Sequence, residues 1–155
     1  ELFRMRAGID LVHIPYKGSA PAMTDLLGGQ VNLMFETIPA AISQIKSGKL
    51  KALGVTGAKR SSLFAEVPTI AESGLPGFEV QSWYGLVAPA ATPKDIVARL
   101  NAATVKGAGG KEFRERMEPL GFEIVTGTPE RMFEMVKADA ARWAPVVKAS
   151  GARID

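Results

Sequence analysis

The feature that most constrains the fold is an alternation of short apolar segments with stretches of helical character. The apolar, β-branched runs predict strands, and the stretches between them begin and end with residues typical of helix boundaries. We expect strands at 10–14, 31–36, 51–56, 80–89 and 123–125, and helices at 20–27, 39–47, 69–72, 92–107, 111–120 and 128–150. Strands and helices that alternate along a chain favour an α/β domain, with a largely parallel sheet covered by flanking helices.

Several helix boundaries are specific enough to be tested. Gly8 is expected to end an N-terminal helix, and Thr69 and Glu72 have the spacing of a capping box. In the longest helix, Trp143 belongs to an apolar stripe and is expected in the core. Pro145 lies inside the same helix, and because proline lacks an N–H group we expect it to bend or split the helix.

Residues 13–30, HIPYKGSAPAMTDLLGGQ, contain a complete strand end, loop and helix. Gly18 and Ser19 predict a turn, Ser19 or Ala20 is expected to cap the helix that follows, and Gly28 is expected to end it. A helix that begins in this way directs free backbone N–H groups and the positive end of its dipole toward the loop. Such a helix start suits a carboxylate or another small anion. An ordinary strand-to-helix connection is the alternative, and local physics alone favours it.

Composition and charge exclude several classes of function. The 155 residues carry 19 Lys and Arg against 16 Asp and Glu, and the net charge of +3 is spread without a basic stripe, which argues against a nucleic-acid partner. The sequence has no cysteine, which excludes thiolate chemistry, and no apolar run reaches the roughly 18 residues of a membrane span.

His13 is the only histidine, so this chain holds no triad or multi-histidine metal site, and we expect His13 to be packed and hydrogen-bonded. No serine lies in a G-x-S-x-G motif. We therefore expect no catalytic residue, no metal ligand and no cofactor.

The chain resembles a known receptor family over nearly its whole length. The similarity runs from Val12 to Pro93, through blocks such as VHIPYKGSAPAMTDLLGGQVNLMFETIP, and continues through Arg142-Trp143 and Val146–Lys148. These blocks resemble the extracytoplasmic solute receptors of tripartite tricarboxylate transporters, also called Bug proteins. The resemblance implies a periplasmic binding protein with a type II-like α/β fold, in which two lobes close on a small, usually carboxylate-bearing, metabolite.

The same resemblance implies partners and a domain organisation. The expected ligand is a dicarboxylate, a tricarboxylate, an amino acid or an aromatic acid, the expected protein partners are membrane permease subunits, and the expected location is the periplasm. Relatives begin with a signal peptide and a further stretch about as long as this chain, so we interpret the sequence as the C-terminal half of a two-lobed receptor. Residues 1–79 would supply the second, ligand-binding lobe, and residues 80–155 would return to the first lobe and end in a long helix.

Two segments carry the candidate ligand-binding residues, and we expect them to lie side by side as one wall of a cleft. Glu36 ends the expected 31–36 strand, and open α/β sheets bind ligands at the carboxyl ends of their strands. Similar receptors commonly carry aspartate there, facing a polar or amino group of the ligand; a solvated acid that caps the next helix is the alternative for Glu36. The complete predicted set is Tyr16, Lys17, Gly18, Ser19, Ala20, Glu36 and Thr37.

Several side chains have two open interpretations. Lys17 could counter a ligand carboxylate or be merely solvated. Trp83 and Tyr84 could line the cleft or pack beneath it, and core packing is the preferred interpretation because a buried tryptophan is most often a core residue.

Two other classes of function stay open at this point. The chain could be the effector-sensing domain of a regulator, because receptor-like lobes also serve transcription factors. A hydrolytic enzyme is less favoured, because it would need an acid–base or nucleophile constellation that these residues do not provide. A helix-turn-helix upstream would favour the regulator, and a secretory signal peptide upstream would exclude it.

Overall fold

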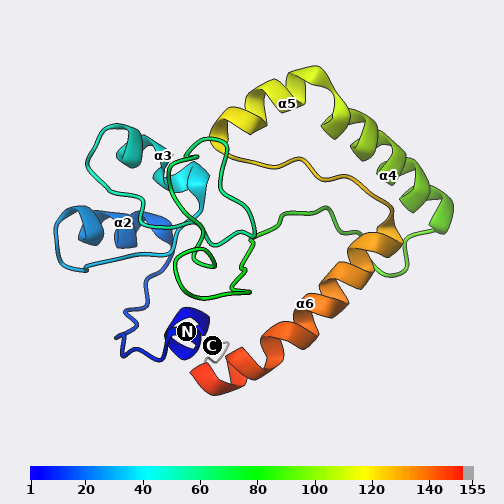
Figure 1. Cartoon of the computed structure of the whole chain (residues 1–155). Coiled ribbons are helices and arrows are strands. Elements are labelled where there is room, and N and C mark those ends of the chain that lie inside the picture. Colours follow the sequence, from blue (N-terminus) through cyan, green and yellow to red (C-terminus); the bar gives the residue numbers. More distant parts are fainter. Residues whose placement is uncertain (152–155) are drawn as a thin grey trace. The chain divides into compact units, whose positions relative to one another are not determined.

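The computed structural model describes residues 1–151, and the chain divides into two compact units. The central unit consists of Leu11–Tyr84 and Arg116–Glu123. The terminal unit consists of Glu1–Asp10, Gly85–Glu115 and the chain from Ile124 onward. The course of the chain through the helices can be followed in Figure 1. The assignment of residues 1–79 and 80–155 to two lobes concerns the complete receptor and stays a prediction.

Four helices form within two residues of their predicted boundaries, and the predicted 111–120 helix is α-helical to Met117 and continues as a 3₁₀ helix to Leu120. The short 69–72 segment is the exception, since it forms a turn rather than a regular helix. The predicted end of the first helix is confirmed, because Gly8 adopts φ 64° and donates its N–H to the carbonyl of Arg4 at 3.0 Å. The helices are α1 (Leu2–Ala7), α2 (Ser19–Leu27), α3 (Ile38–Lys46), α4 (Lys94–Gly109), α5 (Lys111–Met117), the 3₁₀ helix η1 (Glu118–Leu120) and α6 (Pro129–Ser150).

The predicted strands do not form ladders in the described part of the chain. One isolated parallel bridge joins Val55 and Thr69, in which Val55 donates to the carbonyl of Pro68 and accepts from the N–H of Ile70, both at 2.9 Å. The five strand predictions are therefore wrong as statements about this chain. A strand needs a neighbour that offers N–H and C=O groups along its whole length. The segments 51–56 and 80–89 share the hydrogen bond from the Val80 N–H to the carbonyl of Thr56 at 2.8 Å, but no ladder continues from it within residues 1–151.

The central unit has a small hydrophobic core built on one face of α3. Ile42, Phe64 and Val67 are buried together. The partly buried residues that pack against them are Ile38, Ile45, Ala52, Val55 and Leu63. The three isoleucines recur at intervals of four and three residues, so they share one side of the helix. The core thus ties α3 to the loop that contains Phe64 and Val67.

Gly121 fixes the approach of η1 to α3 inside the central unit. It ends η1 with φ 91°, a conformation that favours glycine. A Cβ atom added at this position would lie 2.5 Å from Cγ2 of Ile38, the first residue of α3. Any residue with a Cβ atom at position 121 would therefore clash with Ile38, unless η1 moved away from α3.

The terminal unit consists of helices that bury few of their side chains. No residue of α4 or α6 is buried, and Phe133 and Val147 of α6 are 66% and 52% exposed. The Asn101 side-chain amide of α4 donates to the carbonyl of Gly127 at 2.9 Å and so links α4 to the start of α6. The apolar faces predicted for these two helices are thus exposed in this chain.

Two predictions about α6 concern Pro145 and Trp143. The helix runs unbroken from Pro129 to Ser150, so Pro145 does not split it; that Pro145 bends the helix stays a prediction. Proline removes only the hydrogen bond to the carbonyl of Ala141, and because Ala141 is exposed, water can satisfy that carbonyl. Trp143 is half-buried rather than part of a core, since α6 meets too few neighbours in this chain, and the guanidinium of Arg142 lies 5.5 Å from its ring centroid.

Candidate functional site

The loop before α2 places a glycine, not a serine, at the helix cap. Gly18 is the N-cap residue, with φ 108° and ψ 178°. The prediction that Ser19 or Ala20 caps the helix is therefore wrong, because the turn needs a positive φ that glycine adopts without strain. Ser19 and Ala20 are instead the first two helical residues. No side chain caps α2, and helix geometry gives the N–H groups of its first turn no intrahelical acceptor.

Tyr16 ties this loop to the helix that follows it. Its hydroxyl donates to Oδ2 of Asp25 across 2.7 Å, and both side chains are partly buried. This hydrogen bond is the largest of the effects that raise the pKa of Tyr16 above its ordinary value of 10.0. Lys17, Ser19 and Ala20 beside it are exposed. The loop is thus held at Tyr16, while the residues after it are accessible.

Glu36 and Thr37 form a local pair at the start of α3. Oε1 of Glu36 accepts from the backbone N–H of Thr37 at 2.7 Å and from its hydroxyl at 3.2 Å. Thr37 is the N-cap residue of α3 and has an extended backbone. A carboxylate at this end of a helix is stabilised by the helix dipole. Glu36 contacts its neighbour Thr37 rather than the N–H groups of the first helical turn, and α3 has no side-chain cap hydrogen bond. The capping alternative is therefore not supported, and the role of Glu36 in ligand binding stays a prediction.

Both predicted segments, Tyr16–Ala20 and Glu36-Thr37, belong to the central unit. The contacts within each segment are local, one to the body of α2 and the other to the start of α3. That the two segments form one wall of a cleft stays a prediction.

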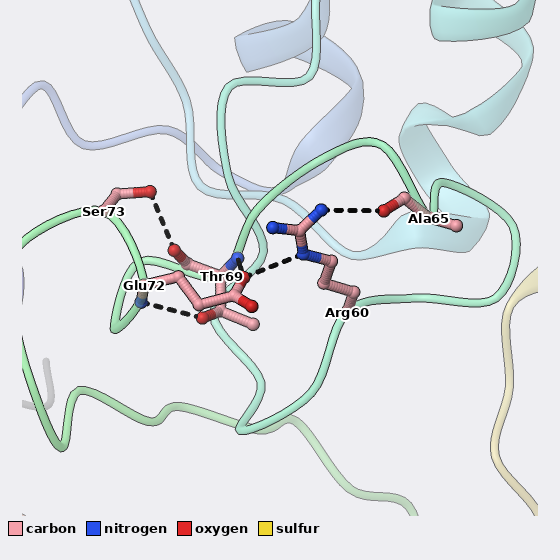
Figure 2. A network of polar contacts seen from close by, with 5 residues as sticks. All are labelled: Arg60, Ala65, Thr69, Glu72 and Ser73. Atoms are coloured by element: carbon pink, nitrogen blue, oxygen red, sulfur yellow. Dashed lines mark hydrogen bonds and ion pairs between the residues drawn. The ribbon is translucent and has the colours of Figure 1, made fainter.

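The strongest polar network of the central unit was only half predicted. Figure 2 shows the capping box, in which Thr69 donates its N–H to Oε2 of Glu72 at 2.7 Å and accepts from the N–H of Glu72 at 3.0 Å. Arg60 joins it, donating to the same Glu72 oxygen at 2.9 Å and to the carbonyl of Ala65 at 3.1 Å. These contacts, the hydrogen bond from Thr69 first and that from Arg60 next, lower the pKa of Glu72 below 4.5.

The network is structural, and part of it could not be read from the sequence. Thr69 is only 2% exposed, so its polar groups are satisfied inside the unit. The capping box is confirmed because its two partners lie three residues apart. Arg60 lies twelve residues from Glu72 in a polar loop, and no local signal assigns it a partner.

Two further interpretations of single residues are wrong in this chain. Trp83 and Tyr84 are 42% and 74% exposed, so they are not core residues; the segment 81–91 that holds them is exposed throughout. His13 is also exposed rather than packed. The expected strands form no ladder within residues 1–151, so no sheet covers these side chains. Tyr84 contacts Phe122 edge to face, with ring centroids 6.0 Å apart.

Residues 1–151 show neither a metal site nor a membrane span. In this range no group of three or more acidic or histidine side chains could hold a metal ion. Likewise, no helix within it combines the length and the apolar character needed to cross a bilayer.

The sequence of this chain matches a known protein family over almost its whole length. Residues 1–152 match the family described as "Tripartite tricarboxylate transporter family receptor". The chain belongs to this receptor family. Protein BugT of Bordetella pertussis is 38% identical over 154 residues, which cover 99% of this chain and 47% of BugT. The chain spans about half the length of the curated relatives it matches.

Several solved structures of periplasmic binding proteins are similar to this chain in sequence and in fold. R. palustris Rpa4515, solved with adipate, is 38% identical with a TM-score of 0.88, covering 97% of this chain and 50% of Rpa4515. The periplasmic binding protein BugD is 42% identical with a TM-score of 0.84, covering 97% and 51%. MatC of Rhodopseudomonas palustris, with bound malate, is 35% identical with a TM-score of 0.80, covering 94% and 51%. The predicted α/β fold of the periplasmic-binding-protein type is confirmed, and the chain is a part of such a receptor.

Proposed function

We propose that the chain forms part of a periplasmic receptor that captures a small carboxylate and delivers it to the membrane permease subunits of a tripartite transporter. The observation that carries this proposal is the family match over residues 1–152, together with likeness to proteins solved with adipate and malate. Both are dicarboxylates, which supports a dicarboxylate as the ligand of this receptor ahead of tricarboxylates, amino acids and aromatic acids. The receptor would bind and release its ligand unchanged, without catalysis. The comparisons favour neither the regulator nor the hydrolytic enzyme.

The start of α2 supports an anion-binding role for the Tyr16–Ala20 loop. Its N-cap is a glycine without a capping side chain, so a carboxylate can approach the backbone N–H groups of Ser19 and Ala20 closely. Glu36 carries a negative charge and would face a hydroxyl or amino group of the ligand instead. In this proposal residues 1–79 supply the ligand-binding lobe, and residues 80–155 return to the other lobe.

A binding experiment on the complete receptor tests the proposal. Calorimetry would compare adipate, malate, citrate, glutamate and benzoate. We expect at least one carboxylate to bind and an uncharged amide analogue of it to bind far more weakly. A receptor that binds none of the five carboxylates would contradict the proposal.

A variant of Ser19 locates the site. Ser19→Leu should weaken binding by obstructing the first N–H groups of α2, and it should cost little stability because Gly18, not Ser19, is the cap. Ser43 is an equally exposed serine inside α3, so Ser43→Leu is the matched control. Unchanged affinity in Ser19→Leu would remove this loop from the site.

A further inference from the structure

The hydrogen bond between Tyr16 and Asp25 spans the start of α2. It joins a residue two positions before the Gly18 cap to a residue in the last turn of α2, nine positions along the chain. At 2.7 Å, with a charged acceptor, it belongs to the stronger class of protein hydrogen bonds. It therefore ties the loop that enters α2 to the body of the same helix.

The position of Asp25 is unfavourable for a free carboxylate. α2 ends at Leu27, and its last turn has no basic side chain. A negative charge there lies near the negative end of the helix dipole. The hydrogen bond from Tyr16 offsets this cost, which gives the acid at this position a specific partner.

The direction of the bond also determines what Tyr16 can do. A phenol hydroxyl has a single proton to donate, and in this structure Asp25 accepts it. The same bond is the largest of the effects that raise the pKa of Tyr16. A ligand carboxylate needs donors, so the hydroxyl of Tyr16 could serve such a carboxylate only after its bond to Asp25 is broken.

We propose that Tyr16 and Asp25 are a positioning pair, which holds the Gly18–Ala20 turn ready for a carboxylate without touching the ligand through the Tyr16 hydroxyl. This inference rests on the proposed function and deepens it. Holding the turn in its bound conformation lowers the entropy lost when the ligand binds. The pair thus acts through the N–H groups of Ser19 and Ala20.

The test uses the complete receptor and four single variants. Tyr16→Phe removes only the hydroxyl, and Asp25→Ala removes the acceptor. Asp25→Asn keeps an acceptor oxygen and serves as the conservative rescue. Thr104→Val is the control for the loss of a hydroxyl, because Thr104 is exposed on α4 and belongs to neither predicted segment.

Two measurements separate positioning from ligand contact. Hydrogen–deuterium exchange of the ligand-free receptor should show faster exchange across residues 16–22 in Tyr16→Phe and Asp25→Ala, and no change in Thr104→Val. Titration with adipate and malate should show about three- to tenfold weaker binding in the same two variants, with Asp25→Asn within about twofold of wild type. The double variant Tyr16→Phe/Asp25→Ala should be no weaker than the weaker single variant, because both remove one bond.

Two outcomes would contradict the positioning role, and a third would contradict the proposed function. Unchanged exchange across residues 16–22 would overturn the positioning role. So would affinity that is lost in Tyr16→Phe but kept in Asp25→Ala, since that pattern marks direct contact of the hydroxyl with the ligand. If the wild-type receptor binds neither acid nor any other carboxylate, the proposed function fails, while the exchange measurement still decides whether the pair holds the loop.

Discussion

The central and terminal units are built from the same kinds of residues but hold them differently. The central unit has a buried cluster around Ile42 and a network in which Thr69, Glu72 and Arg60 satisfy one another. In the terminal unit α4 and α6 bury no residue, and Leu86 and Val87 are 76% and 88% exposed. A segment with its own hydrophobic core can hold a loop in place. Helices with exposed apolar faces instead need another protein surface to cover those faces.

The largest expected effect concerns the isolated 155-residue chain. Titrated with the same carboxylate as the complete receptor, it should bind weakly or not at all, because one wall of a cleft leaves the ligand open to competing water. Calorimetry of the two proteins side by side provides the measurement. Equal affinities would show that the 155-residue chain alone holds a complete site.

The next largest effect is a loss of stability from altered packing in the central unit. Gly121→Ala should lower the free energy of unfolding of the receptor by about 2–4 kcal/mol, because the new Cβ meets Ile38 and the backbone has a positive φ. Gly48→Ala is the control, since Gly48 has φ 73° and open space around it, and it should cost only about 1 kcal/mol. Equal costs in urea denaturation would show that η1 does not press on α3.

A smaller effect is expected on the surface of the terminal unit. Phe133→Ser should reduce self-association of the isolated chain, because it removes a large exposed apolar side chain. Its effect on the stability of that chain should stay within about 0.5 kcal/mol. Sedimentation velocity of the two chains measures the association. If Phe133→Ser associates as strongly as the original chain, the surface that mediates self-association does not include Phe133.

The smallest effect is a pH dependence from Glu72. Its folded pKa lies below 4.5, so the unfolded chain binds the proton more readily than the folded one. The contribution of Glu72 to stability is therefore full above its unfolded pKa and is lost as the pH falls through the folded pKa. Glu72→Gln should flatten the fall in stability between about pH 5 and pH 3. Denaturation at several pH values measures it, and parallel curves for the two proteins would contradict it.

The parts that could be predicted from the sequence are those with local causes. Gly8 ends α1, and Thr69 and Glu72 pair, because each outcome depends on residues within one helical turn. The start of α2 was predicted to within one residue, and only its cap was assigned wrongly, since the sequence gives no φ for Gly18. The family resemblance added the fold and the class of protein, which no single segment specifies.

The parts that could not be predicted depend on distant partners. Arg60 finds Glu72 twelve residues away, and Tyr16 finds Asp25 nine residues away, so neither pair has a periodic signal. Strand formation depends on neighbours of the backbone, and the segments from 31–36 to 123–125 find almost none in this chain. The exposure of Trp83 has the same cause.

The exposed segment 80–89 has a consequence for how such a receptor must fold. Its residues VQSWYGLVA carry no charge and no proline before Pro89, and runs of this composition readily form intermolecular cross-β contacts. While it is exposed, this run can pair with an identical run on a second molecule. We therefore expect the complete receptor to aggregate less readily than the isolated chain if its other half covers this segment.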